Sequence, residues 1–334
     1  MKSKVFILIL LYYPLFCFGQ FKFKRDTIQK IDSSSFVDFY KKKIFYTDLG
    51  FNTAPFSINF KDSLGNRDHL YFRNNSRPTL GIGFSYKWLS LRVTFNVFSH
   101  LHSISKFGKT SYLDLGLDFK TKRRFYDIDL HNYEGYALKN AYNWNDSLDK
   151  AVNPHLILPS INTLSISVNT WRFLNKNINM SALKGKTALY LKKEQSFYLK
   201  TTFNLFGVGN SGSIIPLEKF NPYNSKTGST TISAFDFGIL PGYVYVNRYQ
   251  NWQYSGMFGF GPVIQSKFYF INQNQRAYLG LAPRVDIRIL IGYNKPKYFI
   301  NLVTEFDNKS IRFRDLTYRQ TYYSIKLVGG IRLD

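Results

Sequence analysis

The chain alternates apolar and polar residues over long runs, and this pattern restricts its fold more than any other feature. Within 79–88 every second residue is apolar, namely Leu80, Ile82, Phe84, Tyr86 and Trp88. In 89–98 the alternation continues with its phase inverted. A period of two places the apolar side chains on one face of a β-strand. An inverted phase between two adjoining runs indicates a tight hairpin.

Twelve segments carry this alternation and are predicted to be strands. They are 44–52, 79–88, 89–98, 112–120, 123–131, 161–173, 196–206, 232–246, 253–270, 279–293, 298–307 and 320–333. The region 56–73 is expected to form either a further hairpin or the first long loop.

Two architectures use such strands. A soluble β-protein buries the apolar face, whereas a transmembrane barrel turns it to lipid and encloses the polar face. The runs reach or exceed the 9–11 residues or so that a spanning strand needs. The 32 Phe, 25 Tyr and 4 Trp residues suit aromatic girdles at the membrane interfaces. We predict an all-β fold, a transmembrane antiparallel β-barrel of about 12 strands with a range of roughly 10–14. A soluble secreted β-protein is the alternative.

The first twenty residues predict export from the cytoplasm. Two lysines precede an apolar run over 5–18, and the small residues Cys17 and Gly19 follow at the spacing of a signal-peptide cleavage site. We expect cleavage between Gly19 and Gln20. Acylation of Cys17 as a lipoprotein is disfavoured because bulky Phe16 precedes it. The predicted location is the cell outer membrane.

The predicted domains are a signal peptide (1–19), a periplasmic N-terminal segment (20–43) and a barrel (44–334). An even strand number places both chain ends on the periplasmic side. The short connections 88/89, 121–122, 247–252 and 294–297 share that side, while the longer ones at 99–111, 132–160, 207–231 and 308–319 face outward. The connection 174–195 is long yet falls on the periplasmic side, and nothing in the sequence explains it.

The chain is strongly basic, with a net charge of +24, and its single cysteine, Cys17, lies in the predicted signal peptide. A mature chain without cysteine excludes disulfides, thiol nucleophiles and Cys-ligated zinc. Nucleic acid is not an expected partner, because the basic residues are scattered and the chain is exported. The predicted periplasmic segments are the most basic. We therefore hypothesise contact with outer-membrane lipids, with a generally basic proteome as the alternative.

Charged residues on the polar faces of the strands are predicted to line the lumen. They are Arg92, Asp114, Asp118, Asp127, Asp129, Arg284, Asp286, Arg288, Glu305, Asp307, Lys326 and Arg332. These side chains form either a polar pore for a small solute or a set of ion pairs that closes the lumen.

Three other motifs suggest chemistry only weakly. Gly207, Gly209 and Gly212 fit a dinucleotide-binding pattern, but the prolines that follow prevent the helix which that pattern requires. His100 and His102 share a face without a nearby carboxylate to complete a metal site. Together with Ser99, these two histidines form the one local cluster suited to a lipid hydrolase. We expect no cofactor, no metal and no catalytic residue.

Several short motifs resemble a known family. They are Tyr86-Lys87-Trp88-Leu89, Gly108-Lys109-Thr110 followed by Asp114, and Phe125-Tyr126-Asp127-Ile128-Asp129 running to Tyr133-Glu134-Gly135-Tyr136. With the signal peptide, they resemble a Bacteroidetes outer-membrane family catalogued as domain of unknown function 4421. The chain departs from the family pattern at His131, where glutamine is expected. The resemblance implies a fold and a location, and it supplies no catalytic residue.

These observations predict an outer-membrane barrel that passes or binds a small polar solute or serves a structural role in the envelope. An interfacial lipid-modifying barrel enzyme is the alternative. The sequence leaves the oligomeric state open.

Overall fold

The computed structural model describes residues 35–62, 65–97, 99–121, 124–271 and 274–334. The predicted signal peptide, its cleavage site and most of the predicted N-terminal segment lie outside these residues. In the described part of the chain, no helix combines the length and apolar character needed to cross a membrane.

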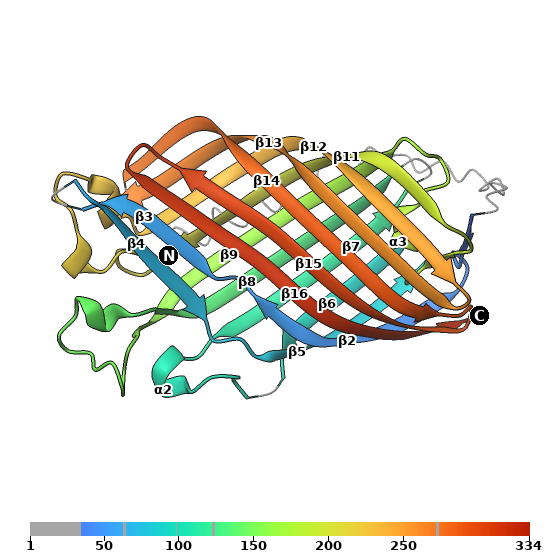
Figure 1. Cartoon of the computed structure of the whole chain (residues 1–334), viewed down its shortest axis with the longest axis horizontal. Coiled ribbons are helices and arrows are strands. Elements are labelled where there is room, and N and C mark those ends of the chain that lie inside the picture. Colours follow the sequence, from blue (N-terminus) through green and yellow to red (C-terminus); the bar gives the residue numbers. More distant parts are fainter. Residues whose placement is uncertain (1–34, 63–64, 98, 122–123, 272–273) are drawn as a thin grey trace. The chain divides into compact units, whose positions relative to one another are not determined.

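Twelve antiparallel strands close into a ring in which each strand pairs with two neighbours (Figure 1). They are β2 (Lys43–Thr53), β5 (Pro78–Tyr86), β6 (Leu89–Asn96), β7 (Ser111–Lys120), β8 (Phe125–Leu138), β9 (Leu156–Phe173), β11 (Glu194–Gly209), β12 (Thr231–Tyr249), β13 (Trp252–Ile271), β14 (Asn274–Asn294), β15 (Tyr298–Arg312) and β16 (Leu316–Leu333). Each predicted segment overlaps one of these strands. The predicted twelve-stranded antiparallel barrel is confirmed.

The outer surface of this ring is apolar. Ile82 and Phe258 keep 56% and 51% of their surface exposed, while residues adjacent to them in sequence are buried. The pleat of a strand sends alternate side chains to opposite faces, so the predicted period of two separates an apolar outside from a polar inside. A closed ring, an even strand number and an outward apolar band characterise outer-membrane barrels. The chain is a transmembrane β-barrel of this type.

An extra hairpin narrows the ring at one end. β3 (Phe56–Lys61) follows β2 and pairs with the start of β16, and β4 (Arg67–Asn74) pairs with the end of β8. β6 and β7 do not extend to this level of the barrel, so β4 pairs directly with β8 there. Within the described part of the chain, ten strands surround the lumen there, although the hydrogen-bonded ladder between β14 and β15 has already ended. The region 56–73 is therefore a hairpin, one of its two predicted forms.

The two ends of the barrel differ in their connections. At the turn end, which includes the C-terminus, strands are joined by 87–88, 121–124, 250–251 and 295–297. At the loop end they are joined by longer segments, including 97–110, 139–155 and 210–230. The predicted long connection 308–319 is wrong, because β15 and β16 extend into it and leave only 313–315.

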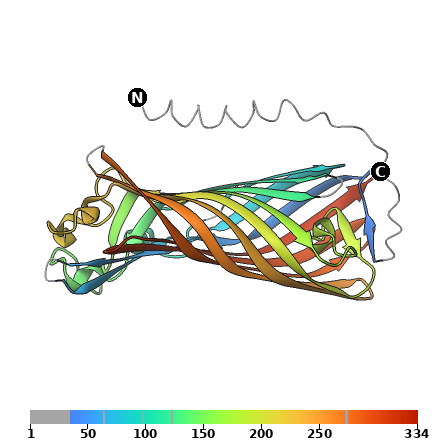
Figure 2. The ribbon, with the colours of Figure 1, turned by 90° about the horizontal axis from the view of Figure 1, so that it is seen from above.

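Short helices occur in the connections. They are α2 (Ile104–Phe107), α3 (Met180–Leu183) and the 3₁₀ turns η1 (Ala141–Asn143), η2 (Leu217–Lys219) and η3 (Ser225–Gly228). Residues 174–193, hereafter the plug, contain α3 and β10 (Ala188–Tyr190), both fully buried. β10 pairs with β1 (Phe36–Asp38) in a separate two-stranded sheet. Figure 2 shows this yellow-green segment at the turn end. The connection that sequence could not explain is long because it folds inward.

Candidate functional site in the lumen

The plug is held to the barrel wall by a buried lysine. Asp118 on β7 lies directly opposite Asp127 on β8, and two like charges in that position repel. Lys184 of the plug places its Nζ 2.5 Å from Asp118 Oδ1 and 2.7 Å from Asp127 Oδ2. Lys186 of the plug adds a second cation 3.5 Å from Asp118 Oδ2, so the plug supplies the positive charge that this carboxylate pair lacks within the barrel wall.

The backbone of the plug is also bound by side chains of the wall. The carbonyl oxygen of Gly185 accepts hydrogen bonds from Asn294 Nδ2 at 2.7 Å, Asn301 Nδ2 at 3.3 Å and Arg332 at 3.1 Å. Gly185 has a φ of +67°, which is strained for other residues, and a Cβ there would lie 3.0 Å from Asn301 Nδ2. Gln253 donates to the carbonyl of Ala182 at 2.8 Å. These bonds satisfy plug backbone groups that burial removes from water.

Charged side chains fill the middle of the lumen as two clusters. In the first, Asp114 is fully buried, and both Arg92 and Lys326 approach its carboxylate to 3.1 Å. Asp129 lies 3.4 Å from the Arg92 guanidinium. The Arg92 guanidinium thus pairs with two carboxylates, and the buried charge of Asp114 has the partners that burial requires.

The second cluster centres on Arg284 of β14. Its guanidinium contacts Asp307 at 2.9 Å and Asp236 at 3.1 Å, and it donates to Asn204 at 3.0 Å. Lys309 lies 3.4 Å from Asp307. Every acidic residue of this cluster therefore has a cationic partner.

Two further pairs complete the charged layer. Arg288 pairs with Glu305 directly across the β14–β15 ladder, and Lys200 lies 3.1 Å from Asp286. The structure thus places all twelve predicted lumen residues on inward positions, each with a charged or hydrogen-bonded partner.

Sequence reasoning missed several cations and two buried acids, Asp48 and Asp236, that the strand alternation turns inward. Asp236 occupies an alternating position in the predicted strand 232–246, so the pattern could have revealed it. Lys200 likewise lies within a predicted strand, whereas Lys309 lies just beyond one. Lys184 comes from a connection without periodicity and carried no signal.

Toward the loop end, an apolar core replaces the charges. Phe56 and Phe72 stack with ring centroids 4.4 Å apart, and both are at most 1% exposed. Tyr136 and Tyr318 pack on Phe56 at 5.0 and 5.4 Å. Inward residues from β3, β4, β8 and β16 thus close the ten-stranded end with packed aromatic rings.

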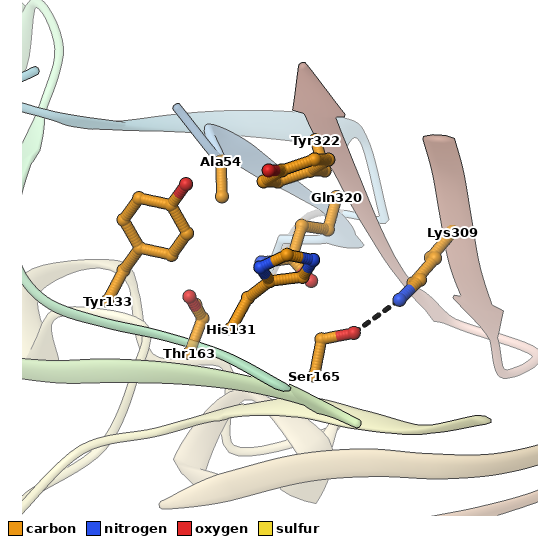
Figure 3. A pocket seen from close by; sticks show the side chains of 8 residues that line it. All are labelled: Ala54, His131, Tyr133, Thr163, Ser165, Lys309, Gln320 and Tyr322. Atoms are coloured by element: carbon orange, nitrogen blue, oxygen red, sulfur yellow. Dashed lines mark hydrogen bonds between the residues drawn. The ribbon is translucent and has the colours of Figure 1, made fainter. Parts of the chain in front are cut away.

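A small cavity lies between the charged layer and the apolar core (Figure 3). Its lining consists of Ala54, His131, Tyr133, Thr163, Ser165, Lys309, Gln320 and Tyr322. The Lys309 ammonium donates to Ser165 Oγ, and His131 stacks on Tyr322 at 4.4 Å. A lysine beside a hydroxyl can assist nucleophilic chemistry. The cavity of about 10 Å³ has room for one water molecule and for no larger substrate.

The histidines at the loop end act as hydrogen-bond acceptors. His100 Nε2 accepts from the Thr110 backbone at 3.1 Å, His102 Nε2 from Arg73 at 2.8 Å, and His155 Nδ1 from the Asn140 backbone at 3.2 Å. Burial is the largest cause that lowers the pKa of each imidazole, and nearby arginine and lysine side chains add to it. The three rings are therefore held neutral.

The weakly suggested chemical motifs have structural roles or none. In the described part of the chain, no hydrogen bond joins Ser99 to either neighbouring histidine, and no three His, Cys, Asp or Glu side chains gather as a metal site requires. Gly207 and Gly209 belong to β11, where a Cβ at Gly207 would meet the Ile232 carbonyl oxygen. Neither glycine precedes a phosphate-binding helix.

Comparison with known families decides the membership of the chain. A family model described as "Domain of unknown function (DUF4421)" matches residues 25–331. The chain belongs to the DUF4421 family. The resemblance drawn from the short motifs is confirmed, and the match spans nearly the whole barrel.

Two motifs behind that resemblance meet at the point where the ring narrows. Thr110 Oγ1 donates to the Gly135 carbonyl at 2.7 Å, and the Asn75 backbone donates to Thr110 Oγ1 at 2.8 Å. Gly135 has a φ of +91°, and a Cβ there would lie 2.0 Å from the Lys109 carbonyl oxygen. In this DUF4421 protein, these residues therefore connect β4, β7 and β8 at the point where the ring narrows.

Solved structures with a similar arrangement include several barrels of outer membranes. The outer-membrane protease OmpT of Escherichia coli is 8% identical, with a TM-score of 0.42 over 89% of this chain and 98% of its own. The translocator domain of the autotransporter NalP of Neisseria meningitidis is 8% identical, with a TM-score of 0.39 over 84% and 88%. The toluene transporter TodX of Pseudomonas putida is 9% identical, with a TM-score of 0.30 over 87% and 89%.

Identity this low transfers none of their activities to the DUF4421 chain. A search among curated proteins gives no match.

Proposed function

We propose that this DUF4421 protein is a closed outer-membrane barrel with a structural role in the envelope, and that it has no open path for solutes at rest. The observation that carries the proposal is the filling of the lumen at three successive levels. The plug occupies the turn end, ion pairs occupy the middle, and the aromatic core occupies the loop end.

Electrostatics supports a closed barrel. A conducting pore needs wetted charges that ions can approach. Here the side chains of Asp114, Arg284 and Lys326 are at most 5% exposed, and each is bound to opposite charge. Opening a path would separate these pairs in a poorly hydrated interior, which costs several kcal/mol for each buried charge left alone.

Packing at the loop end supports the same conclusion. Even if the plug left the barrel, Phe56, Phe72 and Tyr318 would remain packed across the ten-stranded end. The proposal includes export by the predicted signal peptide, with cleavage between Gly19 and Gln20. It also places the turn end in the periplasm and the loop end outside, following the short-turn and long-loop pattern of outer-membrane barrels.

The test is conductance of the folded mature protein in a planar bilayer, with a porin in the same bilayer as positive control. Insertion is verified separately by protection from protease in vesicles. We expect an inserted but silent protein. Steady openings whose ion selectivity changes in the double variant Arg284→Gln/Arg288→Gln would overturn the proposal, because they would reveal a path along the charged wall.

A further inference from the structure

The outward face of β15 and β16 changes character abruptly toward the loop end. Phe306 and Tyr323 lie directly opposite each other and are the last outward aromatic residues on these two strands. Beyond them the outward positions are polar, with Asn308 donating to Thr321 at 3.1 Å. Aromatic residues at such a boundary mark the level of lipid headgroups.

Two exposed arginines stand just beyond this boundary. Arg312 of β15 lies opposite Thr317, and Arg319 of β16 lies opposite Ser310 and, on its other side, Ser57 of β3. They are diagonal neighbours on one face, roughly 7–8 Å apart at the backbone, which is within joint reach of their long side chains.

No acidic group neutralises this pair of arginines. Within the described residues neither Arg312 nor Arg319 takes part in an ion pair. Glu305 and Asp307 of the same strand face the lumen, where they are paired. Asp315, in the turn between the two strands, lies 3.4 Å from Lys61. The patch therefore combines two free guanidinium groups with surrounding hydroxyls.

The surface beside this patch is open and apolar. The β14–β15 ladder ends at Val285 opposite Asn308, two residues before Pro283, which has no N–H to donate. Further along β14, Leu281 and Leu279 are 72% and 77% exposed. A ligand held by the arginines can thus lay hydrocarbon against neighbouring apolar side chains.

We propose that Arg312 and Arg319 bind the phosphate of a lipid headgroup in the outer leaflet, while its acyl chains lie along the apolar band below. Paired guanidinium groups suit phosphate because each donates two parallel hydrogen bonds. The site goes beyond the proposed structural role and rests on the proposed orientation of the loop end. A silent bilayer recording neither supports nor weakens it, so the two proposals fail separately.

The test uses the folded mature protein in neutral detergent and native mass spectrometry. The probes are lipid A carrying two phosphates and the same lipid with its phosphates removed. We expect the wild type to bind the phosphorylated lipid, and Arg312→Gln/Arg319→Gln to bind it at least about tenfold more weakly. Arg276→Gln, an exposed arginine of β14 outside the patch, should bind like the wild type.

Three results would overturn the proposal. They are equal binding by wild type and double variant, equal binding of the dephosphorylated lipid, and displacement of the lipid by an equal concentration of inorganic phosphate. Should the double variant fail to fold, Arg319→Gln and the charge-preserving Arg312→Lys/Arg319→Lys replace it. We expect an intermediate affinity for the lysine variant, because lysine lacks the planar two-donor geometry.

Discussion

The middle of the lumen and the loop end are filled by opposite kinds of side chain, and single strands pass through both. In the half near the turn end, β16 turns Ile325 and Leu327 outward and Lys326 inward. Near the loop end the same strand turns Arg319 outward and Tyr318 inward. Hydrocarbon on the outside requires the first arrangement, and a polar environment on the outside requires the second. The polarity of the two faces therefore inverts without any slip in the strand.

The lumen shows what this difference means for stability. The middle of the lumen, next to the apolar side chains of the plug, has a polar interior that depends on the pairing of buried charge. The loop end resembles a soluble protein with a packed apolar interior, whose stability depends on how completely side chains fill its volume. Substitutions in the two regions should therefore differ in what rescues them.

The largest expected effect is at the plug. Lys184→Met removes the cation shared by Asp118 and Asp127 and leaves only Lys186, 3.5 Å from Asp118, beside the facing carboxylates. It should lower the free energy of unfolding by about 3–5 kcal/mol. Guanidinium unfolding in detergent measures it. Adding Asp118→Asn and Asp127→Asn should recover most of the loss, whereas Lys176→Met, at an exposed position of the plug, should have little effect. No rescue by the added changes would contradict charge pairing as the cause.

A smaller loss is expected at Gly185. Alanine there adds a Cβ in a left-handed conformation and crowds Asn301, so Gly185→Ala should cost about 1–2 kcal/mol. The same unfolding measurement applies. Gly256→Ala is the matched control, since no atom lies within 4 Å of the added Cβ. Equal stability of the two variants would show that the plug backbone adjusts freely.

At the loop end, removal of one methylene group tests whether packing of the apolar core limits stability. Ile58 is fully buried in the aromatic core, and Ile58→Val should cost about 0.5–1.5 kcal/mol, insensitive to salt. Ile300→Val removes the same group from the half-exposed outer surface and should cost less. A larger loss of stability in Ile300→Val than in Ile58→Val would contradict the conclusion that packing of the apolar core limits stability at the loop end.

The smallest effect is a pH dependence confined to the loop end. Because His100, His102 and His155 have lowered pKa values in the folded state, the released loops bind protons more readily than the docked ones. Their contribution to stability is complete above the ordinary histidine pKa of about 6.5 and is lost as pH falls through it. The protection of 99–110 against hydrogen exchange, taken relative to the intrinsic exchange rate at each pH, should fall as the pH is lowered from about 8 to about 5.

His69→Gln, outside this group, should leave that pH dependence unchanged, whereas His102→Gln should reduce it. Protection that does not change with pH, once the intrinsic rate is divided out, would show that the three acceptor bonds do not hold the loops.

The sequence predicts the barrel well because its evidence is local. The alternation shows which side of a strand faces lipid. Each strand that crosses the lipid-facing part of the barrel carries this pattern in its own residues. The prediction failed at 308–319, where the faces of β15 and β16 exchange character and the apolar positions move inward. An alternation whose apolar side changes midway does not stand out as one strand.

By itself, the sequence determined the twelve strands of the ring, the family and part of the inward set of charges, since spacing along the chain decides these. Only the tertiary structure decided how the lumen is filled. Lys184 reaches Asp118 and Asp127 from a segment without periodicity, and the ten-stranded end arises because β4 meets β8. Both depend on contacts between residues far apart in the chain, and no local pattern encodes which distant partner balances a buried charge.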